Sequence, residues 1–205
     1  MKMPPTIRYR VLAVPLVIMI LAGCSTVQLQ QSWRNPNIKP APLTNLLVLG
    51  AAEQPSTRRL FEDVFVAELR KQGLKAQPTY PLLSLSQQIN RPKTEEIIRQ
   101  TGADGIIMAK LVGVQDFTRT MYPVSTPANI WTDPAVYPVG ETFSRYSLEV
   151  RLYESGAGTP VWLGTFTTFD PDRMLAVSGD LAVVTIQQLK RDGFLAPAPA
   201  GGGTP

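Results

Sequence analysis

Cys24 is the only cysteine in this 205-residue chain, and the chain contains no histidine. A lone thiol can act as a nucleophile, pair in a disulfide or accept a covalent group. Without histidine, neither a Ser-His-Asp site, a Cys-His site nor a histidine zinc site can form. A metal would need oxygen ligands, and the sequence contains no spaced Asp, Asn and Gly loop to supply them. We therefore predict no metal site and no cofactor.

The acidic residues that stand close together have structural explanations. Asp170 and Asp172 flank a proline after an apolar stretch, which is typical of a turn in which Asp172 caps the next helix. Glu62 and Asp63 are adjacent on a predicted helix, so their side chains diverge by about 100° and do not clasp one ion. We therefore predict no catalytic residues, and an enzyme ranks third among the functions considered below.

The first 25 residues are arranged as an export signal. A basic segment carrying Lys2, Arg8 and Arg10 precedes the short apolar run "VLAVPLVIMILAG". This run is shorter than the roughly 20 residues that a membrane-spanning helix needs. The last four residues before Ser25 resemble the lipobox of bacterial lipoproteins: Leu21, Ala22, Gly23 and Cys24.

The lipobox resemblance implies a fate for Cys24. In that family the thiol receives a diacylglyceryl group, the signal is cut before the cysteine, and the new amino terminus is acylated. Residues 1–23 would then be a signal peptide, and Cys24 would anchor the chain stably through several acyl chains. Because Ser25 stands where an aspartate would resemble an inner-membrane retention signal, we expect the periplasmic face of the outer membrane, with the inner membrane as the alternative.

Removal of the signal would also remove most of the net charge. The whole chain has a formal net charge of +4, with 20 basic and 16 acidic residues. Loss of Lys2, Arg8 and Arg10 leaves 17 basic residues against the same 16 acidic ones, a balance of +1. The basic character that would suggest nucleic-acid binding is lost, so we predict no nucleic-acid partner.

The rest of the chain predicts one α/β domain. We expect a lipidated tether over 24–43, a globular domain over 44–195 and a disordered tail over 196–205. Apolar patterns predict a single mixed sheet in the order β-α-β-α-β-β-β-α, with the first three strands parallel and a terminal hairpin at an edge. The strands are expected at 45–51, 74–80, 105–117, 143–153 and 161–169, and the helices at 56–72, 93–101 and 172–195.

Residue patterns within these elements predict which faces are buried. The strand over 105–117 is almost continuously apolar, as expected of a strand covered on both faces. In the first helix, the spacing predicts a buried face and a solvent face that carries Arg58, Arg59, Glu62, Glu68 and Arg70. The arginines at its start could bind an anion, although solvated charges are the simpler interpretation. The buried face of the last helix is expected to carry Leu175, Leu181, Val184 and Leu189.

The arrangement resembles the small α/β domains of bacterial envelope assembly lipoproteins. The similarity is carried by "LLVLGAAEQPSTRRLFEDVFVAEL", "QGLKAQPTY" and "TGADGIIMAKLVGV". Examples are the curli-secretion lipoprotein, lipoprotein activators of penicillin-binding proteins and the amino-terminal domain of the Tol propeller protein. The resemblance implies location and fold rather than an activity.

Residues 118–142, "TRTMYPVSTPANIWTDPAVYPVGET", exceed what the fold needs. A connection this long is usually functional or disordered, and aromatic residues with arginine are typical of protein interfaces. A loop that covers the sheet edge is an equally good interpretation. Our partner-binding candidates here are Arg119, Tyr122, Trp131 and Tyr137.

Together these features predict a non-enzymatic lipoprotein that binds or assembles with other envelope proteins, or with itself. It would act through residues 118–142 or through the hairpin edge. The alternative is a small-ligand or glycan-binding lipoprotein that uses the same aromatic residues as a stacking surface.

Overall fold

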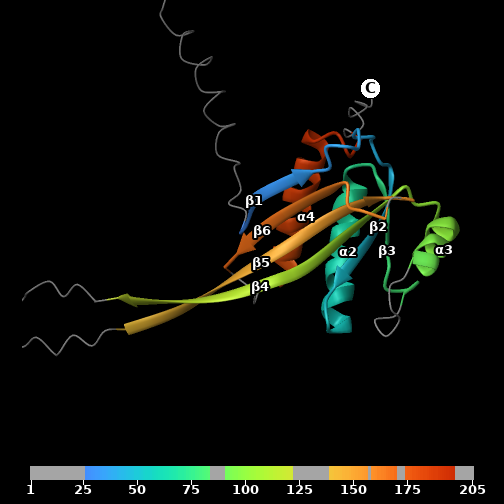
Figure 1. Ribbon diagram of the computed structural model, residues 1–205. Coiled ribbons are helices and arrows are strands. Elements are labelled where there is room, and N and C mark those ends of the chain that lie inside the picture. The colour runs from blue at the N-terminus through green and yellow to red at the C-terminus, as the bar shows by residue number, and fades with distance from the viewer. Residues whose placement is uncertain (1–25, 84–90, 122–138, 157, 170–173, 197–205) are drawn as a thin grey trace, which may run out of the picture.

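The computed structural model describes residues 26–83, 91–121, 139–156, 158–169 and 174–196. These form one six-stranded sheet and three helices (Figure 1). Across the sheet the strands lie in the order β1-β6-β5-β4-β2-β3. The element bounds are β1 Val27–Arg34, β2 Asn45–Ala51, α2 Pro55–Lys71, β3 Lys75–Pro78, α3 Arg91–Thr101, β4 Gly105–Met121, β5 Val139–Glu154, β6 Trp162–Thr168 and α4 Met174–Arg191.

The sheet is mixed, as the sequence predicts. β2 pairs in parallel with both β3 and β4, because a helix connects each successive pair of these strands. The pairs β4–β5, β5–β6 and β6–β1 are antiparallel. The α/β class and the single mixed sheet are therefore confirmed.

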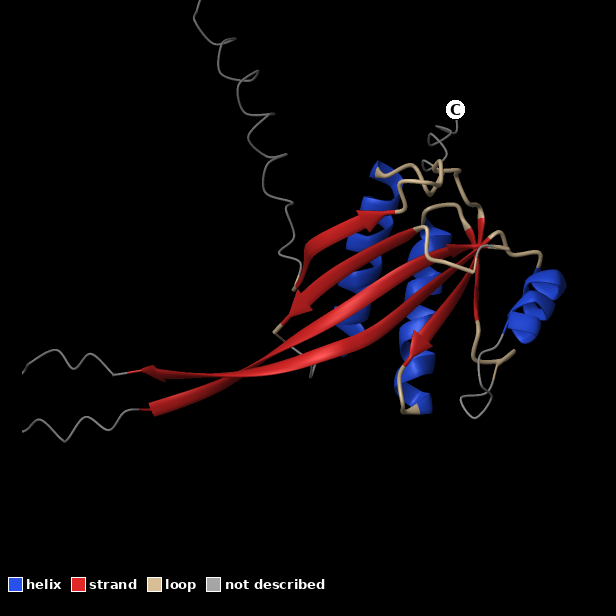
Figure 2. Cartoon of the chain, viewed as in Figure 1, coloured by secondary structure: helices blue, strands red, loops and turns tan. Residues whose placement is uncertain are grey.

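Helices α2 and α4 pack against one face of the sheet and against each other (Figure 2). The helix residues buried between these layers include Phe65, Leu69, Leu181 and Leu189, and the sheet contributes Val48, Ile107, Leu152 and Phe166. Trp162 is completely buried, and its indole N–H donates a hydrogen bond to Asp192 Oδ2 at 2.8 Å. The main core therefore lies on this side of the sheet.

Helix α3 lies apart from the other two helices, at the β2–β3 end of the sheet (Figure 2). Its Ile97 packs in a second, smaller cluster with Leu47 and Leu49 of β2, and with Leu83 and Ala103. On this face, β4, β5, β6 and β1 carry half-exposed or exposed side chains, among them Leu163, Arg151 and Trp33. We refer to this surface as the open face of the sheet.

The predicted solvent face of α2 is wrong at two positions. Arg58 and Glu62 are 3% and 0% exposed. They are buried because every polar group finds a partner: Arg58 Nε donates to Glu62 Oε1 at 2.7 Å, and Glu62 also accepts from the backbone N–H groups of Gly50, Thr79 and Tyr80. A buried ion pair has the same helical spacing as an exposed one, so the sequence pattern alone placed it in solvent.

Residues 27–34, which we predicted to lie in a tether, form the edge strand β1. They pair with β6 from Val27↔Thr168 to Arg34↔Trp162. Only Val27 is buried, because β1 lies at the edge of the sheet and most of its side chains face water. Because the composition of this segment is polar, the sequence pattern did not predict a strand here. The exposed Trp33 lies on β1 opposite Leu163.

The predicted edge position of the β5–β6 hairpin is also wrong, because β1 covers the free side of β6. The strand predicted over 105–117 continues to Met121, and its partner begins at Val139. Both ends of the predicted 118–142 loop therefore belong to strands. The expectation that 105–117 is covered on both faces fails beyond Lys110, where the side chains become exposed.

Helix α4 begins at Met174, and Leu181 and Leu189 face the core as predicted. Leu175 does not, since it is 61% exposed at the first turn. The proposed cap residue Asp172 and its neighbour Asp170 lie outside the described residues.

Candidate functional site

The paired strands β4 and β5 extend well past the rest of the sheet. β2 pairs with β4 only as far as Lys110, and β6 pairs with β5 only as far as Tyr146. Pairing between β4 and β5 continues beyond both limits to Met121↔Val139. Residues 113–121 and 139–145 therefore form a two-stranded extension, which we call the arm (Figure 1).

The arm and its base expose large apolar side chains. Val114 and Phe117 are 50% and 43% exposed, and Phe143 on the opposite strand is 41% exposed. Leu111 and Val112 at the base are exposed to a similar degree. A two-stranded ribbon has too small a core to be stable alone, and clustered exposed apolar side chains commonly mark an interaction surface.

A β-bulge at Val112 determines which face of the arm these side chains occupy. Leu111 pairs with Leu148 and Gly113 with Ser147, so Val112 has no partner on β5. Before the bulge the even-numbered residues of β4 lie on the open face of the sheet, and after it the odd-numbered residues do. The bulge therefore places Phe117 on the same face as its partner Phe143 and the nearby Arg145.

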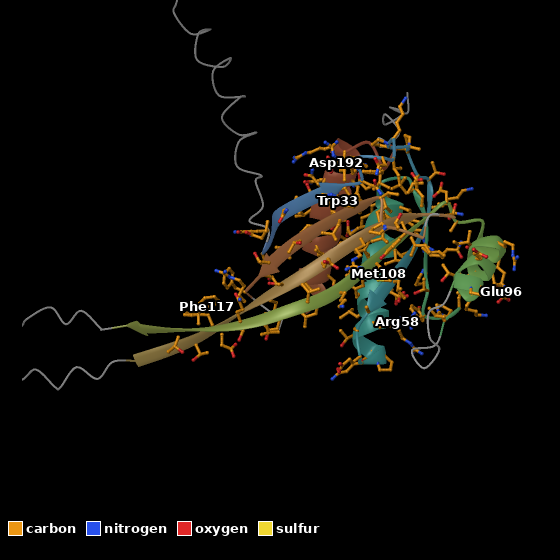
Figure 3. The ribbon with its side chains drawn as sticks, viewed as in Figure 1. Trp33, Arg58, Glu96, Met108, Phe117 and Asp192 are labelled. Atoms are coloured by element: carbon orange, nitrogen blue, oxygen red, sulfur yellow. The ribbon has the colours of Figure 1, made fainter. Side chains whose placement is uncertain are left out.

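Arg145 is held between two aromatic rings on this face. Its guanidinium carbon lies 4.8 Å from the centroid of the Phe117 ring and 5.1 Å from that of Phe169, which directly follows β6. Within the part of the chain that the structure describes, the side chain of Arg145 makes no hydrogen bond or ion pair. We call Phe117, Phe143, Arg145 and Phe169 the arm patch, and Figure 3 labels Phe117 at its position on the arm.

Stacking restricts Arg145 while leaving its N–H donors available. A guanidinium on an aromatic ring gains cation–π attraction without using its in-plane donors. Those donors form a planar fork that matches a carboxylate. The arm patch can therefore bind an acidic group next to an apolar surface, with its arginine already in place.

The opposite face of the arm is different. Here Ser144 Oγ donates to its cross-strand partner Asp116 at 2.7 Å, so the polar groups satisfy one another. Val114, paired with Tyr146, and Leu111, paired with Leu148, add apolar surface near the base. The two faces of the arm therefore differ in the chemistry they can offer a partner.

Arg151 lies on the open face of the sheet, on the domain side of the arm. A hydrogen bond with Tyr153, together with the nearby Glu149 carboxylate, holds the pKa of the Arg151 guanidinium above its ordinary value. Arg151 Nε donates to Glu149 Oε1 at 2.7 Å. Unlike Arg145, this arginine already has its acidic partner, so it has less to offer a ligand.

The residues predicted to bind a partner are only partly visible in the structure. The backbone of Arg119 lies in β4 opposite Glu141, while its side chain falls outside the described residues. Tyr122, Trp131 and Tyr137 also lie outside them, as does Cys24. The structure therefore does not bring these side chains together. It places the arm patch in the strands that flank them.

Sequence reasoning missed the arm patch, although one signal for it was present. In "FSRYSLEVRLY" the alternation puts Phe143 on the same side as Arg145, Ser147 and Glu149. An aromatic residue on an otherwise polar face is the feature that should have attracted attention. Phe117 could not be added to that face without knowledge of the bulge.

The described residues contain neither a metal-binding cluster nor a membrane-spanning helix. No group of three or more acidic or cysteine side chains there is positioned to hold a metal ion. None of the helices in the described ranges has the length and apolarity needed to cross a membrane.

Comparisons with known proteins identify only distant similarities. No protein-family model and no curated protein sequence matches the chain. Among solved structures, the PelC dodecamer from Paraburkholderia phytofirmans is similar with a TM-score of 0.44 at 13% identity, over 80% of this chain and 96% of that one. A PDZ domain protein from Parabacteroides distasonis has a TM-score of 0.33 at 9% identity, over 82% of this chain and 37% of its own.

Proposed function

We propose that this chain is a non-enzymatic lipoprotein of the cell envelope, anchored to the outer membrane through Cys24 and facing the periplasm. In this proposal the domain is an interaction module, and the arm patch is its binding surface. The lipobox resemblance supports the anchor. The observation that carries the binding function is Arg145, stacked between Phe117 and Phe169 and without an acidic partner in the described residues.

The partner we propose is another envelope protein that presents a carboxylate beside apolar side chains. Charge complementarity argues for the carboxylate, since the positively charged Arg145 has no acidic partner among the described residues. The exposed rings of Phe117, Phe143 and Phe169 argue for the apolar surroundings. Aromatic and arginine side chains account for much of the binding energy in protein interfaces.

The geometry favours a protein over a small ligand at this position. Small-molecule sites are concave and bury most of the ligand surface. The arm has no strand on either side of it within the described residues, and the rings of its patch remain about half exposed. Binding of a soluble glycan to the aromatic residues is the alternative that the experiment must distinguish.

Photo-crosslinking in cells tests the binding surface. A photoreactive phenylalanine analogue in place of Phe143 is expected to trap one envelope protein, and the analogue at Leu60 of α2, which is similarly exposed, is not. Adding Arg145→Glu should abolish the adduct, while Lys71→Glu on α2 should leave it intact. The purified partner should then bind the wild-type chain, and reversal of its contacting carboxylate to lysine should restore binding to Arg145→Glu.

Intramolecular crosslinks alone from position 143 would contradict the proposal. A second probe at position 131, in place of Trp131, tests whether the 118–142 segment contributes to the same contact. An adduct that persists in Arg145→Glu would show that the arm patch does not recognise the partner. Quenching of tryptophan fluorescence by a soluble glycan, without any protein adduct, would favour the alternative function.

The anchor has a separate test. Cells fed an alkyne-tagged palmitate analogue are expected to label the wild-type chain and not Cys24→Ser. Density-gradient separation of the membranes should then place the labelled chain with the outer membrane. A labelled chain in the inner membrane would correct the location without changing the binding surface.

A further inference from the structure

A cavity lies between α3 and the sheet, on the face opposite α2 and α4. Its volume is about 380 Å³, and it is partly open to solvent. Leu47 and Leu49 of β2 and Ile106 and Met108 of β4 form its apolar floor, and Ile98 of α3 is one of its walls. A mainly apolar hollow of this size is typical of small-molecule sites, which begin at roughly 300 Å³.

Among the described residues, the charged groups that line the cavity are all acidic. Glu95 of α3 and Glu154 at the end of β5 line it, and no lysine or arginine of these ranges does. Glu154 Oε1 is buried and has no hydrogen-bond partner among the described residues. A buried acceptor without a donor is costly, so a ligand that supplied an N–H group to the Glu154 carboxylate would gain both a hydrogen bond and charge attraction.

The rim of the cavity is held in place by the buried ion pair of α2. Arg58 donates through Nη2 to Thr79 Oγ1 and through Nη1 to the carbonyl oxygen of Leu83, each at 2.9 Å, and both of these residues line the cavity. A wall fixed before binding saves the cost of ordering it on ligand entry. The Arg58–Glu62 network therefore gives this cavity a preformed side.

We propose that this cavity binds a small amphiphile with a primary ammonium head. The apolar chain would lie on Leu49, Ile106 and Met108, and the ammonium would donate to Glu154. An anionic amphiphile of the same length is disfavoured, because its head would meet two carboxylates. This site is separate from the arm patch and does not depend on the function proposed there.

Hexylamine is a suitable probe, and hexanoate and hexanol are the comparison compounds of equal chain length. The full chain would be produced with carbon-13 labels on its methionine methyl groups. It would be purified in the form that the cell makes and held in phosphatidylcholine nanodiscs. Met108 reports directly on the cavity floor, and its resonance is assigned by its loss in Met108→Leu. Figure 3 shows Met108 on the sheet and Glu96 on α3.

Hexylamine is expected to shift the Met108 methyl resonance saturably, whereas hexanoate is not. Glu154→Gln should weaken the apparent affinity for hexylamine roughly tenfold, as expected for loss of a charged hydrogen bond, and leave hexanol unchanged. Glu96→Gln, which removes a carboxylate of α3 outside the cavity lining, is the matched control and should behave as wild type. Ile98→Trp, which fills the cavity, should abolish the shift.

Three results would overturn the proposal. One is the absence of a saturable shift at Met108, and another is an equal response to hexanoate. The third is an unchanged hexylamine affinity in a folded Glu154→Gln variant. If that variant does not fold, an Ile98→Trp variant that still shows the hexylamine shift overturns the proposal instead.

Discussion

Arg58 and Glu62 lie one turn apart on α2, fully buried, with Arg58 Nε 2.7 Å from Glu62 Oε1. Together they connect α2 to the end of β2 and to the segment after β3. Glu62 accepts from Gly50 N–H at 3.1 Å and from Thr79 N–H at 2.6 Å. The pair therefore fixes three separate parts of the chain relative to one another.

Glu62→Leu is expected to destabilise the domain by about 3–5 kcal/mol, the usual cost of removing one member of a buried ion pair. It leaves the Arg58 charge and several backbone donors buried without their acceptor. Urea denaturation followed by circular dichroism measures the effect. Glu68→Gln, which breaks the exposed pair with Lys71, should cost no more than about 1 kcal/mol. Equal effects of the two substitutions would contradict this account.

Asp180→Ala is expected to loosen the start of β1. Asp180 Oδ2 accepts hydrogen bonds from Thr26 N–H and Thr26 Oγ1, each at 2.7 Å, and so ties the strand to α4. Amide hydrogen exchange should accelerate at residues 26–29 and change little in β5. Asp116→Ala, which removes a hydrogen bond on the arm, is the matched control and should leave exchange in β1 unaltered.

Gly164→Ala is expected to destabilise the domain by roughly 1–3 kcal/mol through overpacking. A Cβ on Gly164 would overlap the Trp162 ring and lie 2.9 Å from Cε2 of Phe166. Both rings are fully buried and have little room to move. Gly113→Ala should change the free energy of unfolding far less, because its nearest neighbour, Cβ of Ser147, is 3.8 Å away. Thermal unfolding of the two variants provides the comparison.

The pKa of Tyr80 is raised above its ordinary value of 10.0, chiefly by a side-chain hydrogen bond with Asp63. Asp63→Ala should therefore lower this pKa toward 10.0, measured by tyrosine absorbance against pH with Tyr80→Phe as the reference. Because the pKa is raised in the folded state, the stabilisation is present below pH 10 and is lost as the pH rises through the folded value. An unchanged titration in Asp63→Ala would rule out the hydrogen bond as the cause.

Arg145→Lys tests why the arm patch carries arginine. Lysine keeps the positive charge but loses the planar fork and the stacking between the two rings. We expect partner affinity to fall by roughly tenfold, a typical loss for a charged hydrogen bond, while stability changes by less than about 0.5 kcal/mol. Binding measurements with the trapped partner, beside urea denaturation, separate these effects. Wild-type affinity in Arg145→Lys would mean that charge alone suffices.

The sequence predicted the elements whose periodicity is set by the core. The strand predicted at 45–51 corresponds to β2, and the alternation over 143–153 corresponds to β5. The predicted parallel arrangement agrees with the pairing of β2 with both β3 and β4. β2 is buried along most of its length and β5 buries Val150 and Leu152 on its core face, so their apolar patterns directly reflect their environment. β1 lacks such a face, since Val27 is its only buried residue, and was therefore assigned to a tether.

The sequence predicted the candidate site less accurately than it predicted the fold. The expectation that function lies near residues 118–142 concerned side chains outside the described ranges, so it stays a prediction. The arm patch depends on Phe117 and Arg145 sharing a face, which follows from an unpaired residue at Val112. Neither a bulge nor a buried ion pair changes residue composition, and both are determined by tertiary contacts that a single sequence does not display.

The bulge at Val112 also lets β4 change its length without changing which face the arm patch occupies. Deleting Val112 would leave Leu111 opposite Leu148 and Gly113 opposite Ser147, as neighbours on alternate faces of a regular ladder. Phe117 and Arg145 would therefore stay on one face, and every pairing from Gly105 to Leu111 could remain as it is. In evolutionary terms, this joint can lose one residue while both the core and the binding surface are retained.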